Sequence, residues 1–232
     1  KVVLELGSNS AVIIDESANL KLALSSCITG GFSYAGQSCI SVQRIYIQKN
    51  IYHQFENSVI QAVQMLKVGD PLNRDTDVGP MISEIEAQRI ETWVNEAVQQ
   101  EAKILIGGKR AGAIYYPTVL SKVKSEMKVV ALEVFAPLVC FIPYAELNQA
   151  LDMVNDSVYG LQAGIFTQDI QKAFQAVKKI RVGGIMINDV STFRADHMPY
   201  GGVKESGIGR EGLKYAIEEM TDIKMVCFNL DQ

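Results

Sequence analysis

The stretch YAGQSCISVQRIYIQ, residues 34–48, shows how this chain passes from helix to strand. A helical pattern of apolar residues ends at Tyr34, and from Ile40 onward apolar and polar residues alternate as they do in a strand. The residues between them, Gly36, Gln37 and Ser38, favour a loop. We therefore expect Cys39 in or beside a loop between a helix and a strand, a place where functional side chains are common.

Helical and strand patterns alternate along the rest of the chain. Helices are predicted at residues 19–34, 52–66, 83–98, 145–155, 169–180 and 211–220, the third with Ser83 as N-cap and Glu86 at capping-box spacing. Strands are predicted at residues 2–6, 12–14, 45–47, 104–106, 138–142, 163–167, 184–187 and 223–228. The expected fold class is therefore α/β. We expect one compact domain over residues 1–232, with a mostly parallel sheet and helices on both faces in three αβα layers.

Composition narrows the classes of function. The chain has 232 residues, 48% hydrophobic and 21% charged, which is typical of a globular protein with a real core. A net charge of −4 without a basic stripe argues against nucleic acid or an anionic membrane as partner. The longest apolar stretch, residues 129–144, contains Glu133 and two prolines, so no membrane span is expected. Four widely spaced cysteines and two histidines favour neither a disulfide framework nor a metal site, and a reduced, cytoplasmic protein is expected.

Residues 207–212, GIGREG, match the dinucleotide fingerprint GxGxxG letter for letter. That fingerprint requires a buried strand immediately before it and a βαβ unit around it. Here the preceding residues, 199–206, form a polar, glycine-rich stretch. We therefore interpret the match as accidental.

Five other motifs occur in order along the chain. They are ELG at 5–7, GQSC at 36–39, EVFAP at 133–137, NDSVYGL at 155–161 and PYGGVKESG at 199–207. Together with the interval of 34 residues between Glu5 and Cys39, they resemble the aldehyde dehydrogenase superfamily from residue 5 to the C-terminus. The resemblance implies the family's catalytic domain fold and oxidation of an aldehyde to a carboxylic acid with NAD or NADP.

The resemblance also carries expectations about the whole protein. It implies that the family's nucleotide-binding domain precedes Lys1, so the isolated chain is expected to lack full activity. It implies a homo-oligomer, either a dimer or a tetramer. The predicted strand at 223–228 is a natural element for such an interface.

The implied reaction assigns roles to the motif residues. A thiolate adds to the aldehyde, the resulting thiohemiacetal loses hydride, and a water activated by a carboxylate hydrolyses the remaining thioester. By resemblance, Cys39 is the nucleophile, Glu5 is the general base, and the Cys39 backbone N–H is one donor to the oxyanion. Glu133 is expected to hold the nicotinamide ribose and Phe135 to pack beside the nicotinamide.

Several of these residues have simpler interpretations. Free cysteines are usually inert, buried side chains, and we interpret Cys27, Cys140 and Cys227 in this way, on a helix and two strands. An ionised Glu5 in an apolar strand is costly without a partner, so a structural salt bridge is its alternative role. Asn188 is expected to anchor a loop by side-chain hydrogen bonds, and a position near the active site is a second expectation.

The resemblance to the family implies that the segment RADH at 194–197 determines substrate selectivity. Arg194 and His197 suit a carboxylate, phosphate or phosphonate on a small aldehyde, through charge-assisted hydrogen bonds. A surface ion pair between Arg194 and Asp196 is an equal alternative.

Two other functions stay open at this point. A hydrolase could use Cys39 and Glu5 to cleave esters or thioesters without a nicotinamide. A folded but inert fragment, or an interaction module, would carry the same residues without activity. Addition of NAD(P) separates the first alternative from a dehydrogenase.

Overall fold

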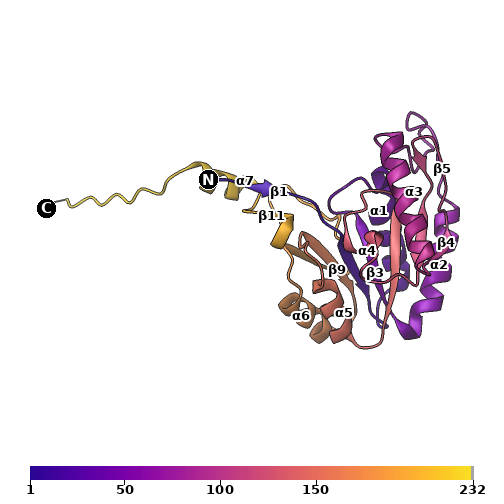
Figure 1. The fold of residues 1–232 in the computed structure, drawn as a ribbon. Helices are drawn as coiled ribbons and strands as arrows, with labels where there is room; N and C mark the ends of the chain where they lie inside the picture. The colour runs from indigo at the N-terminus through magenta and orange to yellow at the C-terminus, as the bar shows by residue number, and fades with distance from the viewer. Residues whose placement is uncertain (231–232) are drawn as a thin grey trace.

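The computed structural model describes residues 1–230, and its centre is a seven-stranded sheet (Figure 1). The strand order is β10-β9-β2-β3-β8-β7-β4. Its strands are β2 (Ser10–Ile14), β3 (Val42–Gln48), β4 (Lys103–Ile106), β7 (Thr118–Ser121), β8 (Leu138–Tyr144), β9 (Gln162–Phe166) and β10 (Gly184–Ile187). All neighbouring pairs are parallel except β4–β7, which is antiparallel. The predicted α/β fold with a mostly parallel sheet is confirmed.

Helices cover both faces of this sheet. They are α1 (Leu20–Phe32), α2 (Tyr52–Gln64), α3 (Glu84–Gln99), α4 (Lys128–Ala131), α5 (Leu147–Asn155) and α6 (Ile170–Lys179). On β2, Val12 and Ile14 pack with α1 and α2, whereas Ala11 and Ile13 pack with α5 and α6. Ile142 contacts both the α5–α6 cluster and the α3–α4 cluster, so these four helices share the second face. Parallel strands buried on both faces carry continuous apolar runs, as residues 11–14 of β2 do, and the three-layer arrangement is confirmed.

The remaining elements are short. They are β1 (Leu4–Glu5), β5 (Arg110–Ala111), β6 (Ile114–Tyr115), β11 (Gly207–Ile208), α7 (Leu213–Met220), and 3-10 turns at Ser33–Gly36, Lys49–Ile51 and Lys204–Ser206. β1 pairs antiparallel with β11, so residues from the two ends of the sequence form one small ribbon. Gly207 has φ 145° there, and a Cβ at this position would collide with the Leu4 carbonyl oxygen. Glycine is therefore required for the ribbon to close.

The ribbon also bears on two sequence predictions. Residues 207–212 do not form a strand–turn–helix unit of the dinucleotide type, because Gly207 and Ile208 pair with β1, and the rejection of that fingerprint is confirmed. The predicted strand at 2–6 is reduced to two residues, and Val2, Val3 and Leu6 are exposed rather than buried.

Two helix predictions can be checked at their first turn. The Ser83 Oγ accepts a hydrogen bond from the Glu86 backbone N–H at 3.3 Å, so the predicted N-cap of α3 is confirmed. The last helix, α7, begins at Leu213 rather than at residue 211. Glu211 instead exchanges backbone hydrogen bonds with Tyr200, and it is therefore extended.

The predicted strand at 223–228 is wrong. Residues 221–230 form no strand, and Ile223, Met225 and Phe228 are exposed. The segment extends away from the body of the molecule (Figure 1). Alternating apolar residues favour an extended backbone, but a strand also needs a neighbour for its hydrogen bonds, and none pairs with it among the described residues.

No helix within residues 1–230 is long and apolar enough to cross a bilayer.

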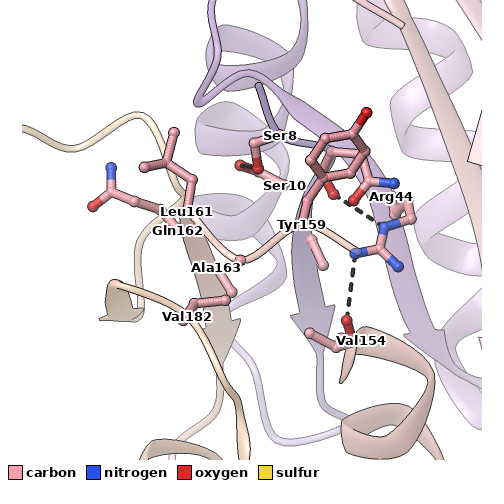
Figure 2. A pocket seen from close by; sticks show the side chains of 12 residues that line it. Ser8, Ser10, Arg44, Val154, Tyr159, Leu161, Gln162, Ala163 and Val182 are labelled. Atoms are coloured by element: carbon pink, nitrogen blue, oxygen red, sulfur yellow. Dashed lines mark hydrogen bonds between the residues drawn. The ribbon is translucent and has the colours of Figure 1, made fainter. Parts of the chain in front are cut away.

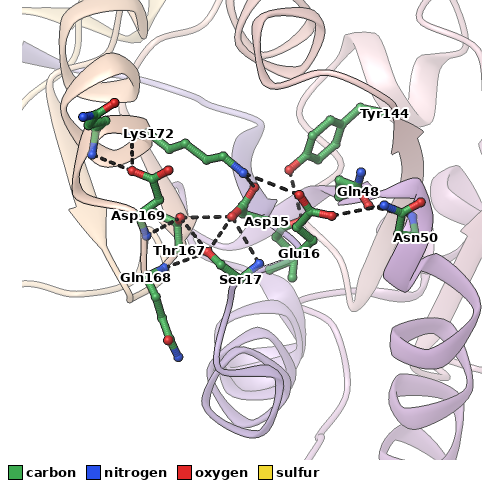
Figure 3. A network of polar contacts seen from close by, with 12 residues as sticks. Asp15, Glu16, Ser17, Gln48, Asn50, Tyr144, Thr167, Gln168, Asp169 and Lys172 are labelled. Atoms are coloured by element: carbon green, nitrogen blue, oxygen red, sulfur yellow. Dashed lines mark hydrogen bonds and ion pairs between the residues drawn. The ribbon is translucent and has the colours of Figure 1, made fainter.

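A polar network lies at the carboxyl ends of the strands (Figure 3). Asp15 follows β2 and is buried; it accepts hydrogen bonds from Lys172 Nζ at 2.7 Å, Ser17 Oγ at 2.6 Å and Thr167 Oγ1 at 3.1 Å. Burial raises the pKa of Asp15, but the bonds from Lys172 and Ser17 outweigh burial and hold it below its usual value. Open α/β sheets commonly bind ligands at this edge. Here the Asp15 carboxylate is occupied by internal donors, which indicates a structural role.

Candidate active site

The candidate catalytic residues lie at the opposite edge of the sheet, at the amino ends of the strands. Glu5 precedes β2, Cys39 precedes β3 and Glu133 precedes β8. These three strands are adjacent and parallel in the order β2-β3-β8. Because parallel neighbours begin at the same edge, the segments before them converge although they are far apart in the sequence.

Tyr200 connects Cys39 to Glu5. Its hydroxyl oxygen lies 3.3 Å from the Cys39 Sγ, and its O–H donates a hydrogen bond to the Glu5 Oε1 at 3.4 Å. Tyr200 is 3% exposed and comes from the segment between β10 and β11. Its backbone exchanges two hydrogen bonds with Glu211, which hold this extended stretch in place. Sequence analysis placed Tyr200 within a shared motif but did not single it out.

The surroundings favour a protonated Cys39 thiol. Burial raises the pKa of Cys39, and its contact with the Tyr200 hydroxyl lowers it. The charge of Glu5 and its hydrogen bond with the thiol raise it further, and so does the charge of Glu133. Burial likewise raises the pKa of Tyr200, and so do its contact with the thiol and the charge of Glu5. Tyr200 therefore stays neutral and keeps its hydroxyl proton. The thiol needs a proton acceptor before it can act as a nucleophile.

The turn that presents Cys39 has an unusual backbone. Tyr34, Ala35 and Gly36 have φ values of 53°, 54° and 66°, all in the left-handed region. A Cβ at Gly36 would collide with the Ala136 carbonyl, so only glycine allows this close approach. Left-handed non-glycine residues cost energy and are concentrated at functional sites. The turn ends α1 abruptly and brings Cys39 to the start of β3.

Glu133 and Phe135 lie on the neighbouring segment, before β8. The Glu133 Oε1 accepts a hydrogen bond from the Ser8 backbone N–H at 2.8 Å. A Cβ at Gly7 would lie 2.6 Å from the Glu133 Oε2, so glycine there makes room for the carboxylate. Burial raises the pKa of Glu133, the Ser8 N–H lowers it, and the charge of Glu5 raises it. Phe135 has φ 53° and is 36% exposed, so a strained backbone presents an aromatic ring at the surface.

Arg44 fixes the segment that bonds to Glu133 (Figure 2). It is buried on β3; its Nε donates to the Asn9 carbonyl at 3.0 Å and its Nη2 to the Val154 carbonyl at 3.4 Å. Asn9 in turn donates from Nδ2 to the Val130 carbonyl on α4 at 2.8 Å. A cavity of about 10 Å³ beside these residues has room for at most one water. Ser8 is therefore held rigidly between β2 and α4.

This geometry agrees with a comparison against known protein families. The model of the aldehyde dehydrogenase family matches residues 1–226. The chain belongs to the aldehyde dehydrogenase family. The resemblance inferred from the five sequence motifs is confirmed.

Individual relatives are similar over almost the whole chain. A 3-sulfolactaldehyde dehydrogenase from Priestia aryabhattai is 53% identical over 99% of this chain and 48% of its own length. The crystal structure of a glyceraldehyde-3-phosphate dehydrogenase from Methanocaldococcus jannaschii complexed with NADP has a TM-score of 0.94 and 43% identity, over 97% of this chain and 49% of that one. Aldehyde dehydrogenase 21 from Physcomitrella patens, complexed with its reaction product succinate, has a TM-score of 0.93 and 45% identity, over 95% and 46%. The chain spans about half the length of the curated relatives it matches.

In this aldehyde dehydrogenase chain, Arg194 is an exposed residue with two internal contacts. Its guanidinium lies over the Tyr200 ring, with Cζ 4.1 Å from the ring centroid, and its Nη2 donates to the Glu211 Oε2 at 3.0 Å. The alternative pairing with Asp196 is wrong, because Glu211 occupies the guanidinium instead. His197 is exposed and forms no hydrogen bond or ion pair within residues 1–230.

Asn188 lies at the other edge of the sheet. Its Oδ1 accepts a hydrogen bond from the Thr167 backbone N–H at 2.9 Å, and its own φ is 57°. The expected loop-anchoring role is confirmed. The suggested closeness to the active site is wrong, since Asn188 follows β10 and bonds to the residue that follows β9, at the carboxyl ends.

The simpler interpretations of the other residues can now be judged. Cys27 and Cys140 are buried, as expected, but Cys227 is exposed on the segment that forms no strand. The expectation that Cys227 is buried in a strand is therefore wrong. Within residues 1–230 Glu5 forms no ion pair, and its carboxylate accepts a hydrogen bond from the Tyr200 hydroxyl. The same residues contain no cluster of three potential metal ligands.

Proposed function

We propose that this chain supplies the catalytic part of an NAD(P)-dependent aldehyde dehydrogenase. In this proposal Cys39 is the nucleophile and Glu5 is the general base, and the product is a carboxylic acid. The observation that carries the proposal is the contact chain from Cys39 through Tyr200 to Glu5, found in a member of this family. Residues 1–232 act as a single catalytic domain.

The chemistry follows from what each group can do. The Cys39 sulfur adds to the aldehyde carbon, and the oxyanion that forms accepts a hydrogen bond from the Cys39 backbone N–H. After hydride leaves, the acyl group remains on sulfur as a thioester. Glu5 then removes a proton from a water that attacks this thioester, which releases the acid and the thiol.

Glu133 and Phe135 fit a nicotinamide nucleotide. The Glu133 carboxylate is held by the Ser8 N–H through one oxygen, which leaves acceptor positions on the other for ribose hydroxyls. The exposed Phe135 ring offers an apolar surface to a flat nicotinamide ring. When bound, NAD or NADP supplies the acceptor for the hydride.

We propose a small anionic aldehyde as the substrate. The relative that is 53% identical is named as a 3-sulfolactaldehyde dehydrogenase. Of the two solved neighbours, one is named for glyceraldehyde 3-phosphate and the other is complexed with its reaction product succinate. These compounds carry a sulfonate, a phosphate or a carboxylate. Arg194 uses only Nη2 for Glu211 and keeps further N–H donors for such a group. His197, three residues on, adds a second donor at the same surface.

The whole protein is proposed to be a cytoplasmic homo-oligomer, a dimer or a tetramer. Support comes from residues 221–230, whose exposed apolar side chains extend from the body and favour burial against another subunit. Sedimentation of the natural protein measures the oligomeric state. A monomer at micromolar concentration contradicts this part of the proposal.

The test of activity uses the natural protein, NAD or NADP, and 3-sulfolactaldehyde, lactaldehyde or succinate semialdehyde. Formation of reduced nicotinamide is followed by absorbance, with Cys39→Ala as the inactive control. A hydrolase would instead cleave an activated ester equally well with and without nicotinamide and leave the cofactor oxidised. Reduction of neither cofactor with any aldehyde would show that the proposed reaction is wrong.

A further inference from the structure

We propose that the Tyr200 hydroxyl is a catalytic proton bridge, which carries the Cys39 thiol proton to Glu5 as the sulfur attacks. This inference rests on the proposed function and assigns a role to a residue outside the nucleophile–base pair. It follows from the placement of one buried hydroxyl between the two groups.

The contacts define the path of the proton. The Tyr200 oxygen is 3.3 Å from the Cys39 Sγ and 3.4 Å from the Glu5 Oε1. Since the hydroxyl donates to the carboxylate, its oxygen is free to accept from the thiol. The Glu5 carboxylate also acts on the thiol directly, through its charge and a side-chain hydrogen bond, so the bridge competes with a direct path. The Tyr200 hydroxyl contacts both groups, and the test must separate the two paths.

The transfer balances without any other reactant. The S–H bond breaks and its proton moves to the phenol oxygen, while the phenol proton moves to the Glu5 Oε1. The electron pair left on sulfur forms the C–S bond with the aldehyde carbon, and the former carbonyl oxygen takes the negative charge. Tyr200 ends with the proton count that it had at the start. Glu5 is then protonated, and it must release this proton to solvent before it can accept one from the water that hydrolyses the thioester.

Tyr200 is suited to pass a proton rather than to keep a charge. Its phenol is buried, and burial raises its pKa, so a stable phenolate is not formed. Two contacts fix the ring: backbone hydrogen bonds to Glu211 and the Arg194 guanidinium over its face. A group fixed between donor and acceptor needs little reorganisation for proton transfer.

A proton bridge and a purely electrostatic effect of Glu5 predict opposite changes in the reactivity of the Cys39 thiol when the Glu5 charge is removed. By electrostatics alone, the Glu5 charge raises the pKa of Cys39, so removal of that charge should make the thiol more reactive near neutral pH. If Glu5 instead receives the thiol proton through Tyr200, its removal should make the thiol less reactive. Loss of the Tyr200 hydroxyl should then have the same effect as loss of the Glu5 carboxylate.

The experiment measures the rate at which iodoacetamide labels Cys39 in the natural protein, by peptide mass spectrometry. A Cys227→Ser background removes the exposed thiol at that position. Tyr200→Phe, Glu5→Gln and the double variant are compared between about pH 6 and pH 8, where an unassisted thiol is mostly protonated. Tyr34→Phe is the matched control, because its side chain is 86% exposed and lies outside the bridge.

We expect Tyr200→Phe and Glu5→Gln each to slow labelling about tenfold at the lower pH, which is the scale of one hydrogen bond to a charged group. The double variant should be no slower than the slower single variant, because both changes interrupt one path. Tyr34→Phe should label at the wild-type rate.

Three results would overturn the bridge: faster labelling in Glu5→Gln, equal rates in Tyr200→Phe and Tyr34→Phe, or additive losses in the double variant. Labelling needs neither aldehyde nor nicotinamide, so its outcome is separate from the proposed oxidation. If the protein oxidises aldehydes while Tyr200→Phe labels normally, only the bridge is wrong. If the labelling results hold but no aldehyde is oxidised, only the proposed function is wrong.

Discussion

The Arg194 guanidinium carbon lies 4.1 Å from the centroid of the Tyr200 ring, so the residue assigned to the substrate anion also contacts the residue beside the nucleophile. Arg194 is about half exposed and shares its charge with Glu211. Its effect on an anionic substrate should therefore be smaller than that of a buried clamp. It should also extend, weakly, to substrates without charge.

Arg194→Ala should lower kcat/KM about tenfold for 3-sulfolactaldehyde or succinate semialdehyde, the lower end expected for loss of a charge-assisted hydrogen bond. For a neutral aldehyde of similar length the loss should be about twofold, through a less firmly held Tyr200. Glu211→Gln is the control: it frees the guanidinium and should increase the preference for anions. Equal losses for charged and neutral aldehydes would contradict an anion site at Arg194.

Glu5→Gln should leave thioester formation possible but slow its hydrolysis. With aldehyde and cofactor, an acyl-enzyme on Cys39 should accumulate, seen as a mass increase and an initial burst of reduced nicotinamide. The burst itself should be slower than in the wild type if Tyr200 delivers the thiol proton to Glu5. Steady-state turnover equal to the wild type would exclude Glu5 as the base.

Glu133→Gln should stabilise the fold and weaken cofactor binding. Burial raises the pKa of Glu133 in the folded protein above its value in the unfolded chain. The free energy that Glu133 contributes to folding is therefore most favourable below the unfolded pKa, and it is lost as the pH rises through the folded pKa. Removal of the charge should therefore add roughly 0.5–1 kcal/mol near pH 7 and little at pH 4. Glutamine keeps the acceptor for the Ser8 N–H.

Urea unfolding at the two pH values measures this difference, and fluorescence titration measures cofactor affinity. Phe135→Leu is a useful comparison, since it removes the aromatic ring and leaves the carboxylate in place. A Glu133→Gln variant that is less stable at pH 7 would show that the carboxylate charge supports the fold.

Asp15→Ala should destabilise the fold by about 3 kcal/mol at pH 7, because it removes a buried acceptor shared by Lys172, Ser17 and Thr167. The folded pKa of Asp15 is depressed, so this stability is present above the unfolded pKa of about 3.9 and is lost as pH falls through the folded pKa. The variant and wild type should therefore converge in acid. Urea unfolding at pH 7 and below pH 3 checks this, and Lys172→Met, which leaves the hydroxyl donors, should cost less.

The sequence predicts the sheet and part of the site for a clear physical reason. Strand and helix patterns are local, and parallel strands that alternate with helices leave few arrangements. Residues that precede neighbouring parallel strands meet at one edge. The shared motifs alone grouped Cys39, Glu5 and Glu133 in the sequence, and the strand order of the sheet explains why they meet.

The contacts that were missed depend on tertiary structure. Tyr200 lies 161 residues from Cys39, and no local pattern indicates that its hydroxyl reaches the thiol. Arg194 pairs with Glu211 rather than with the nearer Asp196, because the backbone pairing of residues 200 and 211 sets the partner. The 223–228 segment has a strand pattern, but its neighbour cannot be deduced from its own residues.

The β1–β11 ribbon has a consequence for the order in which the protein is made. Glu5 and Cys39 leave the ribosome before Tyr200 and β11, which follow Cys39 after more than 150 further residues. The ribbon and the hydroxyl contact form only by long-range pairing, which is the slowest kind of contact to form in a folding chain. The central sheet can therefore assemble during synthesis while the thiol still lacks its partners. A nascent chain stalled before residue 200 would lack the hydroxyl beside the thiol, and the cysteine would gain this partner only when the segment around Tyr200 has emerged and folded back.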